Sequence, residues 1–108
     1  MRNQKELKTW ANRSSFKYAG SIQTGLEIYY GSKFNKIVVP VPNLQELLTF
    51  FHCKEAEIGT SHTSPPENSL GEWLQKNITK TGIASYIGSI LIKERYAKKV
   101  GKTRILFL

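Results

Sequence analysis

Apolar and polar residues recur at helical spacing in the second half of the chain, and this pattern predicts three helices. The clearest stripe places apolar side chains at i, i+3, i+4, i+7 and i+8. Its members are Ile83, Tyr86, Ile87, Ile90 and Leu91. Thr79 precedes the stripe and is a suitable N-cap, so we expect a helix over residues 79–95.

Two shorter helices are expected upstream. Asn43 is a suitable N-cap for a helix over residues 43–54. Ser69 and Glu72 have the spacing of a capping box, in which each side chain satisfies a backbone N–H at the start of a helix. This pair predicts a helix over residues 69–77. The apolar face of the first of these two helices consists of Leu44, Leu47, Leu48 and Phe51.

Runs of β-branched and aromatic residues predict strands. Two such runs flank Gly31-Ser32-Lys33 and indicate a hairpin over residues 26–41, and residues 56–59 are a short strand candidate. YAKKV and TRILFL alternate around Gly101-Lys102, which favours a hairpin with a two-residue type II′ turn. The polar residues 3–12 are expected to form a short first helix or a mobile arm.

Charge changes the picture because it is unevenly spread. The net charge of the 108 residues is +8, made up of +5 in residues 1–36, −4 in residues 37–75 and +7 in residues 76–108. Two basic flanks around an acidic centre suggest a surface that faces a polyanion, most often nucleic acid. The alternative is a basic protein that has no such partner.

Gly101-Lys102-Thr103 ends like a Walker A phosphate-binding loop, but the rest of that motif is missing. The motif needs a glycine five positions before the Gly-Lys pair, and that position is Tyr96. The loop must also open a helix, whereas the residues that follow predict a strand. We therefore interpret these residues as the tip of a hairpin.

Residues 78–108 (ITKTGIASYIGSILIKERYAKKVGKTRILFL) resemble the winged helix-turn-helix pattern of a capped recognition helix followed by a basic two-stranded wing. The predicted order of elements from residue 43 onward is similar to that family as well. The resemblance implies an α+β fold with a winged-helix domain at residues 43–108, which has three helices and a C-terminal hairpin wing. Residues 1–42 are expected to form a basic arm and a β-hairpin extension.

One position departs from the family. Many members carry a glycine directly after the recognition helix, where this chain has Arg95. A left-handed residue usually ends the helix there, and that conformation favours glycine. We therefore expect this cap to be absent or strained.

The resemblance implies that the helix at 79–95 enters the major groove of duplex DNA and that the wing lies near phosphates. The helix face opposite the apolar stripe is small and polar, which suits a close approach to a groove. A plain solvated face is the alternative. Gly82 and Gly88 lower helix stability, which suggests that their small size is useful. Arg104 alternates with apolar neighbours and could equally be an ordinary exposed strand residue. The candidate DNA-binding residues are Thr79, Lys80, Thr81, Ser85, Ser89, Lys93, Lys98, Lys99, Lys102 and Arg104.

Metal and catalytic chemistry find little support. The chain has no aspartate, and its glutamates have no recognisable metal-ligand spacing. His52, Cys53 and His62 offer three ligands without an evident fourth. We expect no metal, no cofactor and no enzymatic activity. The single cysteine and the lack of a long apolar run lead us to expect a cytoplasmic protein without a membrane span.

Three functional classes remain. The leading class is a binder of duplex DNA, either a small regulator or the recognition part of a DNA-processing system. The second is a winged helix that binds RNA or the ribosome, and the third is a protein-interaction module whose basic patches are incidental. A homodimer that reads a paired DNA site is also compatible with the sequence.

Overall fold

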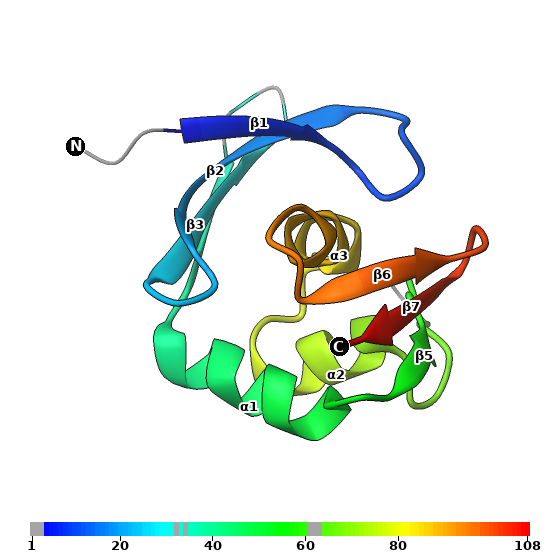
Figure 1. Ribbon diagram of the computed structural model, residues 1–108. Coiled ribbons are helices and arrows are strands. Elements are labelled where there is room, and N and C mark those ends of the chain that lie inside the picture. The colour runs from blue at the N-terminus through cyan, green and yellow to red at the C-terminus, as the bar shows by residue number, and fades with distance from the viewer. Residues whose placement is uncertain (1–3, 32, 34, 61–63) are drawn as a thin grey trace.

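The computed structural model describes residues 4–31, 33, 35–60 and 64–108. These residues form an α+β fold, which confirms the predicted class (Figure 1). None of their helices has the length and apolar character needed to cross a lipid bilayer. The elements in chain order are β1 (Gln4–Lys8), β2 (Ser15–Ser21), β3 (Gly25–Tyr30), β4 (Asn35–Val39), α1 (Val41–Phe51), β5 (Glu55–Glu57), α2 (Leu70–Asn77), α3 (Ala84–Lys93), β6 (Ala97–Val100) and β7 (Arg104–Phe107).

The first four strands form an antiparallel sheet in the order β1-β2-β3-β4. The hairpin predicted over residues 26–41 is confirmed as β3 and β4, although Val41 belongs to α1. The prediction of a helix or arm over residues 3–12 is wrong, because β1 pairs with β2 from Gln4↔Ala19 to Lys8↔Ser15. Backbone pairing holds this edge strand in place, and its charged side chains suit a free sheet edge.

The helix predicted over residues 43–54 is present as α1, but it begins two residues earlier. Pro40 is the N-cap, and its carbonyl accepts hydrogen bonds from the backbone N–H groups of Asn43 and Leu44 at 3.1 and 3.2 Å. Asn43 therefore lies inside the first turn and is not the cap. Pro42 is tolerated there because the first N–H groups of a helix have no intrahelical partner.

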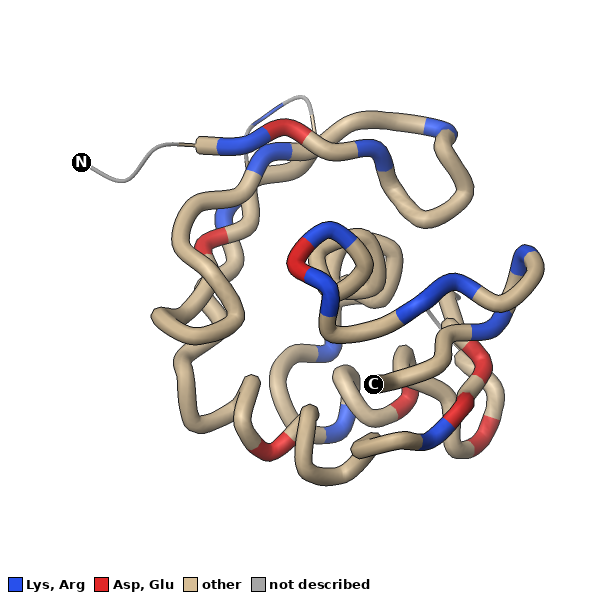
Figure 2. The backbone as a smooth tube through the Cα atoms, in the orientation of Figure 1, with Lys and Arg blue, Asp and Glu red and all other residues tan. Residues whose placement is uncertain are grey.

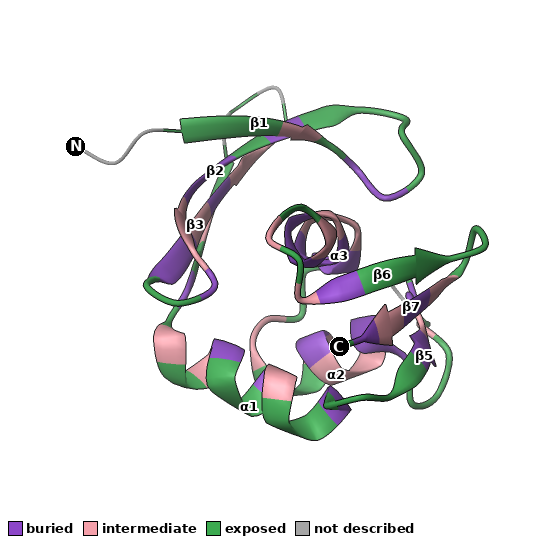
Figure 3. Cartoon of the chain, in the orientation of Figure 1, coloured by how far each residue is buried: buried purple, intermediate pink, exposed green. Residues whose placement is uncertain are grey.

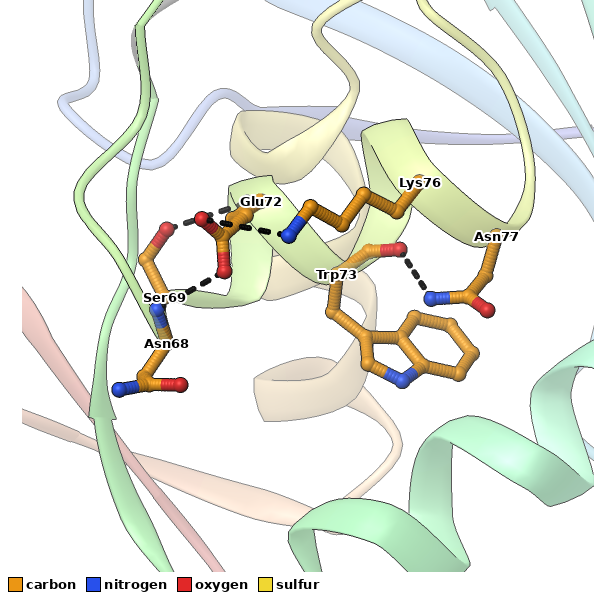
Figure 4. Close-up of polar contacts among 6 residues, drawn as sticks. All are labelled: Asn68, Ser69, Glu72, Trp73, Lys76 and Asn77. Carbon is orange, nitrogen blue, oxygen red and sulfur yellow. Dashed lines mark hydrogen bonds and ion pairs between the residues drawn. The ribbon is translucent and has the colours of Figure 1, made fainter.

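The capping box predicted at the start of α2 is confirmed in its first half. Ser69 Oγ accepts a hydrogen bond from the backbone N–H of Glu72 at 3.1 Å (Figure 4). The Glu72 carboxylate accepts from the backbone N–H of Asn68 at 3.0 Å instead of that of Ser69. Glu72 also lies 3.7 Å from Lys76 Nζ, one turn further along the helix.

The third helix is shorter than predicted. α3 begins at Ala84, with Ile83 as an N-cap that makes no side-chain hydrogen bond. Thr79 is not the cap, because its backbone N–H donates to Leu74 O at 3.1 Å and so belongs to the end of α2. Residues 78–83 link the two helices.

The end of α3 has the left-handed cap that the sequence placed in doubt. Arg95 has a φ of 68°. Its backbone N–H donates to Ile92 O at 3.2 Å, and the N–H of Tyr96 donates to Leu91 O at 2.9 Å. These two bonds form a Schellman motif. The motif is present without glycine, so a non-glycine residue carries the strain of this conformation.

Replacing Arg95 with Gly should therefore stabilise the protein by about 1 kcal/mol, because glycine adopts this conformation without a Cβ clash. Chemical denaturation followed by circular dichroism measures the change. Arg95→Ala is the matched control, since it removes the same charge but keeps the Cβ atom. An equal gain in both variants would mean that charge, and not backbone strain, is responsible.

The C-terminal strands form a second antiparallel sheet in the order β5-β7-β6. The predicted hairpin is confirmed as β6 and β7, and the strand predicted at residues 56–59 is found at Glu55–Glu57. The turn is longer than expected. Val100 pairs with Arg104, so three residues, and not two, connect the strands.

One hydrophobic core joins the two sheets and the helices. α3 lies between the N-terminal sheet and the rest of the molecule (Figure 1). Lys93 is the one exposed residue of this helix, and the other residues are buried or half-buried (Figure 3). The boundary predicted at residue 42 falls within α1, and residues on both sides of it contribute to the same core.

Candidate functional site

The N-terminal sheet and the loop after β1 pack against α3, the helix predicted to read DNA. The ring of Tyr86 packs against Phe16 of β2 and Tyr30 of β3, with ring centroids 4.9 and 5.2 Å apart. The backbone N–H of Trp10, in the loop between β1 and β2, donates to Ser85 O at 3.1 Å. The predicted DNA contacts Ser85 and Ser89 are half-buried.

Trp10 is the central side chain of this contact and is only 4% exposed. It packs directly over Gly88 of α3. A Cβ atom at Gly88 would lie 2.8 Å from Cε3 of Trp10 and 2.6 Å from Cδ1 of Ile58. The small size of Gly88 therefore makes room for two buried side chains. Gly82 precedes α3 and does not belong to the helix.

Gly88→Ala should destabilise the protein by about 2 kcal/mol, although alanine favours a helix, because the added methyl group overpacks the contact with Trp10. Thermal and chemical denaturation measure the change. Ser85→Ala, on the half-buried face of the same helix, is expected to have little effect. A stabilised Gly88→Ala protein would contradict this account of the packing.

Glu94, directly after α3, connects the helix to the N-terminal sheet. Its carboxylate accepts a hydrogen bond from the Tyr18 hydroxyl at 3.0 Å and another from the backbone N–H of Ile22 at 3.0 Å. Burial, and then hydrogen bonding and charge repulsion from Glu94, raise the pKa of Tyr18 to about 12. The neutral phenol is therefore the form that the fold favours.

The pH dependence of stability follows from this shift. The pKa of Tyr18 is higher in the folded protein, about 12, than its ordinary value of 10.0. Its contribution to stability is therefore present below pH 10 and is lost as the pH rises towards 12. The free energy of unfolding should fall more steeply over this interval in the wild type than in Tyr18→Phe. Parallel curves for the two proteins would show that Tyr18 does not titrate in this way.

Trp10 also joins the N-terminal sheet to the β6–β7 hairpin. Its indole Nε1–H donates to the carbonyl oxygen of Lys102 at 2.8 Å. In the opposite direction, Lys99 Nζ donates to Trp10 O at 2.7 Å and lies 4.7 Å from the centroid of the indole ring. The two hairpins, which are far apart in the sequence, therefore meet beside the second half of α3.

A cleft of about 280 Å³ opens where these hairpins meet. We call it the basic cleft. Its apolar lining includes Leu7, Trp10 and Ile92, and its cationic lining consists of Lys8, Lys93 and Lys99. No carboxylate from the described residues lines it. Four other clefts in the described part of the chain each include a glutamate, namely Glu6, Glu27, Glu46 or Glu72.

The basic cleft and the four clefts with a glutamate also lie in differently charged parts of the molecule. Lys and Arg follow β1, the β1–β2 loop, the end of α3 and the β6–β7 hairpin (Figure 2). Glutamates gather along α1, β5 and α2. The basic cleft lies on the cationic side, where the field of the protein attracts anions.

Strand register separates the predicted wing residues from one another. Lys99 lies opposite Ile105, a buried residue, whereas Lys98 lies opposite Leu106 on the other face of the sheet. Arg104 is also on that face, where it forms ion pairs with Glu55 and with Glu57, the latter at 3.1 Å. Hydrogen bonding to Glu55 raises the pKa of Arg104 above its ordinary value. Both of its carboxylate partners would compete with a phosphate for this cation.

The structure brings three of the predicted site residues together, namely Ser89, Lys93 and Lys99, which all line the basic cleft. Lys102 lies close by, since its carbonyl binds Trp10. Thr79, Lys80 and Thr81 precede α3, at the end of the helix away from Lys93. It was not predicted from the sequence that residues from the 7–12 segment line the basic cleft. A tryptophan within a polar segment was the one signal that pointed to them.

Two of the three metal ligands considered from sequence, His52 and Cys53, lie within the described residues. Cys53 Sγ lies 3.4 Å from His52 Nε2, and His62 falls outside the described residues. No group of three or more His, Cys, Asp or Glu residues in the described ranges has the geometry to hold a metal ion.

Comparisons with family models, with curated proteins and with solved structures found no match to this chain.

Proposed function

We propose that this protein binds nucleic acid, and duplex DNA in particular, by holding the phosphate backbone at the basic cleft. The observation that carries this proposal is the lining of the cleft by Lys8, Lys93 and Lys99 without a carboxylate from the described residues. Phosphate contacts from lysine supply most of the affinity of a sequence-independent binder. Exposed Lys102 and Arg13, close to the same hairpins, would extend the contact along the backbone.

We further propose that residues 41–108 are a winged-helix unit. The order of α1, β5, α2, α3, β6 and β7 and the β5-β7-β6 pairing support this assignment. In this proposal the unit does not read bases with α3, because Ser85 and Ser89 on the polar face of that helix are half-buried. Base edges in the major groove are read by an exposed helix face. We therefore expect weak sequence preference and a strong dependence of affinity on salt.

Replacing Lys8 and Lys93 together with Gln should weaken binding to a mixed-sequence DNA duplex by about tenfold at moderate salt. The plot of log affinity against log salt should become shallower by about 1.8, since each lost phosphate contact contributes about 0.9. Fluorescence anisotropy over a series of salt concentrations measures both quantities.

Lys54→Gln with Lys76→Gln is the matched control. It removes the same charge from the acidic side of the molecule, where Lys76 lies 3.7 Å from Glu72. Equal losses in the two double variants would show that net charge, and not the basic cleft, determines binding. Tighter binding to structured RNA than to duplex DNA at matched salt would replace the proposed target with RNA. Wild-type protein that binds neither nucleic acid at low salt would overturn the proposal.

A further inference from the structure

Trp10 makes three hydrogen bonds through different atoms, one with α3 and two with the β6–β7 hairpin. Its backbone N–H binds Ser85 O of α3 at 3.1 Å, and its indole N–H binds Lys102 O in the turn of the β6–β7 hairpin at 2.8 Å. Its carbonyl accepts a hydrogen bond from Lys99 Nζ at 2.7 Å. The loop after β1 is therefore bonded to both α3 and the β6–β7 hairpin, and other residues of these two elements line the basic cleft.

The charged group of Lys99 contacts Trp10, and in this it differs from that of its neighbour Lys98. Its ammonium group lies 4.7 Å from the centroid of the Trp10 ring while it donates to the Trp10 carbonyl. A cation over an indole ring gains electrostatic attraction from the ring face. Lys98 is exposed on the other face of the same strand. The two adjacent lysines thus have different environments, and of these two it is Lys99 that connects the hairpins.

We propose that Trp10 and Lys99 are positioning residues that hold the β1–β2 and β6–β7 hairpins together and so preform the basic cleft. Lys99 acts mainly within the protein, and Lys8 and Lys93 supply the phosphate contacts. This inference rests on the proposed function for its effect on binding, but its structural part stands independently. A cleft held in its binding geometry loses less conformational entropy when the ligand binds.

The matched pair Lys99→Met and Lys98→Met tests the structural part without any ligand. Each variant removes one charge from β6 and keeps a long, unbranched side chain. Hydrogen exchange of the free protein should become on the order of tenfold faster in residues 9–14 and 97–107 of Lys99→Met, because local opening loses both contacts to Trp10. Lys98→Met should exchange like the wild type.

Lys99→Arg should restore most of this protection, since the guanidinium can both donate to the carbonyl and stack on the indole. Recovery by Arg would distinguish the contact with Trp10 from a general effect of lysine on the strand. Equal exchange in Lys99→Met and Lys98→Met would overturn the positioning role of Lys99.

Trp10→Phe tests the link to binding without changing the charge. It keeps a buried ring but removes the indole N–H that binds Lys102 O. Affinity for the DNA duplex should fall by about fivefold, as expected for one lost hydrogen bond, while the salt slope stays at the wild-type value. Unchanged affinity, in a variant whose circular dichroism is that of the wild type, would overturn the role of Trp10 in preforming the cleft.

The two proposals fail in different ways. If the wild type binds no nucleic acid, the proposed function is wrong, and hydrogen exchange still decides whether Trp10 and Lys99 hold the hairpins. If exchange is unaffected in Lys99→Met but Lys8 and Lys93 remain necessary for binding, the proposed function stands and the positioning inference is wrong.

Discussion

The arrangement of the whole molecule follows from the packing of the N-terminal sheet against α3. Trp10 fits against the helix only because Gly88 leaves space for its ring, and the rings of Phe16 and Tyr30 close around Tyr86 on the adjoining surface. Ser85 and Ser89 of α3, two of the residues predicted to contact DNA, are half-buried. The packing contacts also bring the β1–β2 loop to the β6–β7 hairpin, which creates the basic cleft. The same packing therefore covers part of α3 and forms the basic cleft between the two hairpins.

Polar contacts hold the edges of this interface. Glu94 follows the C-terminus of α3, where the helix dipole disfavours an anion. Two hydrogen bonds, from the Tyr18 hydroxyl and the Ile22 N–H, compensate its carboxylate and connect it to the N-terminal sheet. At the other edge, Lys99 satisfies the carbonyl of Trp10. Because buried polar groups are costly without partners, these contacts favour one orientation of the sheet on the helix.

Side-chain patterns along the sequence were sufficient to predict most of the helices and strands, but not where each one begins and ends. The stripe from Ile83 to Leu91 correctly indicated α3, and Ser69 with Glu72 correctly indicated the start of α2. Asn43 and Thr79 have good capping side chains, but Pro40 O and Leu74 O bind the nearby N–H groups instead. β1 was missed because an edge strand is held by backbone pairing with β2, which leaves little trace in the pattern of its own side chains.

Four features could be predicted from the amino-acid sequence, because each depends on neighbouring residues or on composition: the α+β class, the three helices, the C-terminal hairpin and the separation of charge along the chain. Which lysines share a surface depends instead on how the strands pair and pack. Strand register placed Lys98 and Lys99 on opposite faces of one strand and paired Arg104 with Glu55 and Glu57. The contact of Trp10 with Lys99 and Lys102 joins segments about 90 residues apart in the chain, and no periodicity within either segment encodes such a contact.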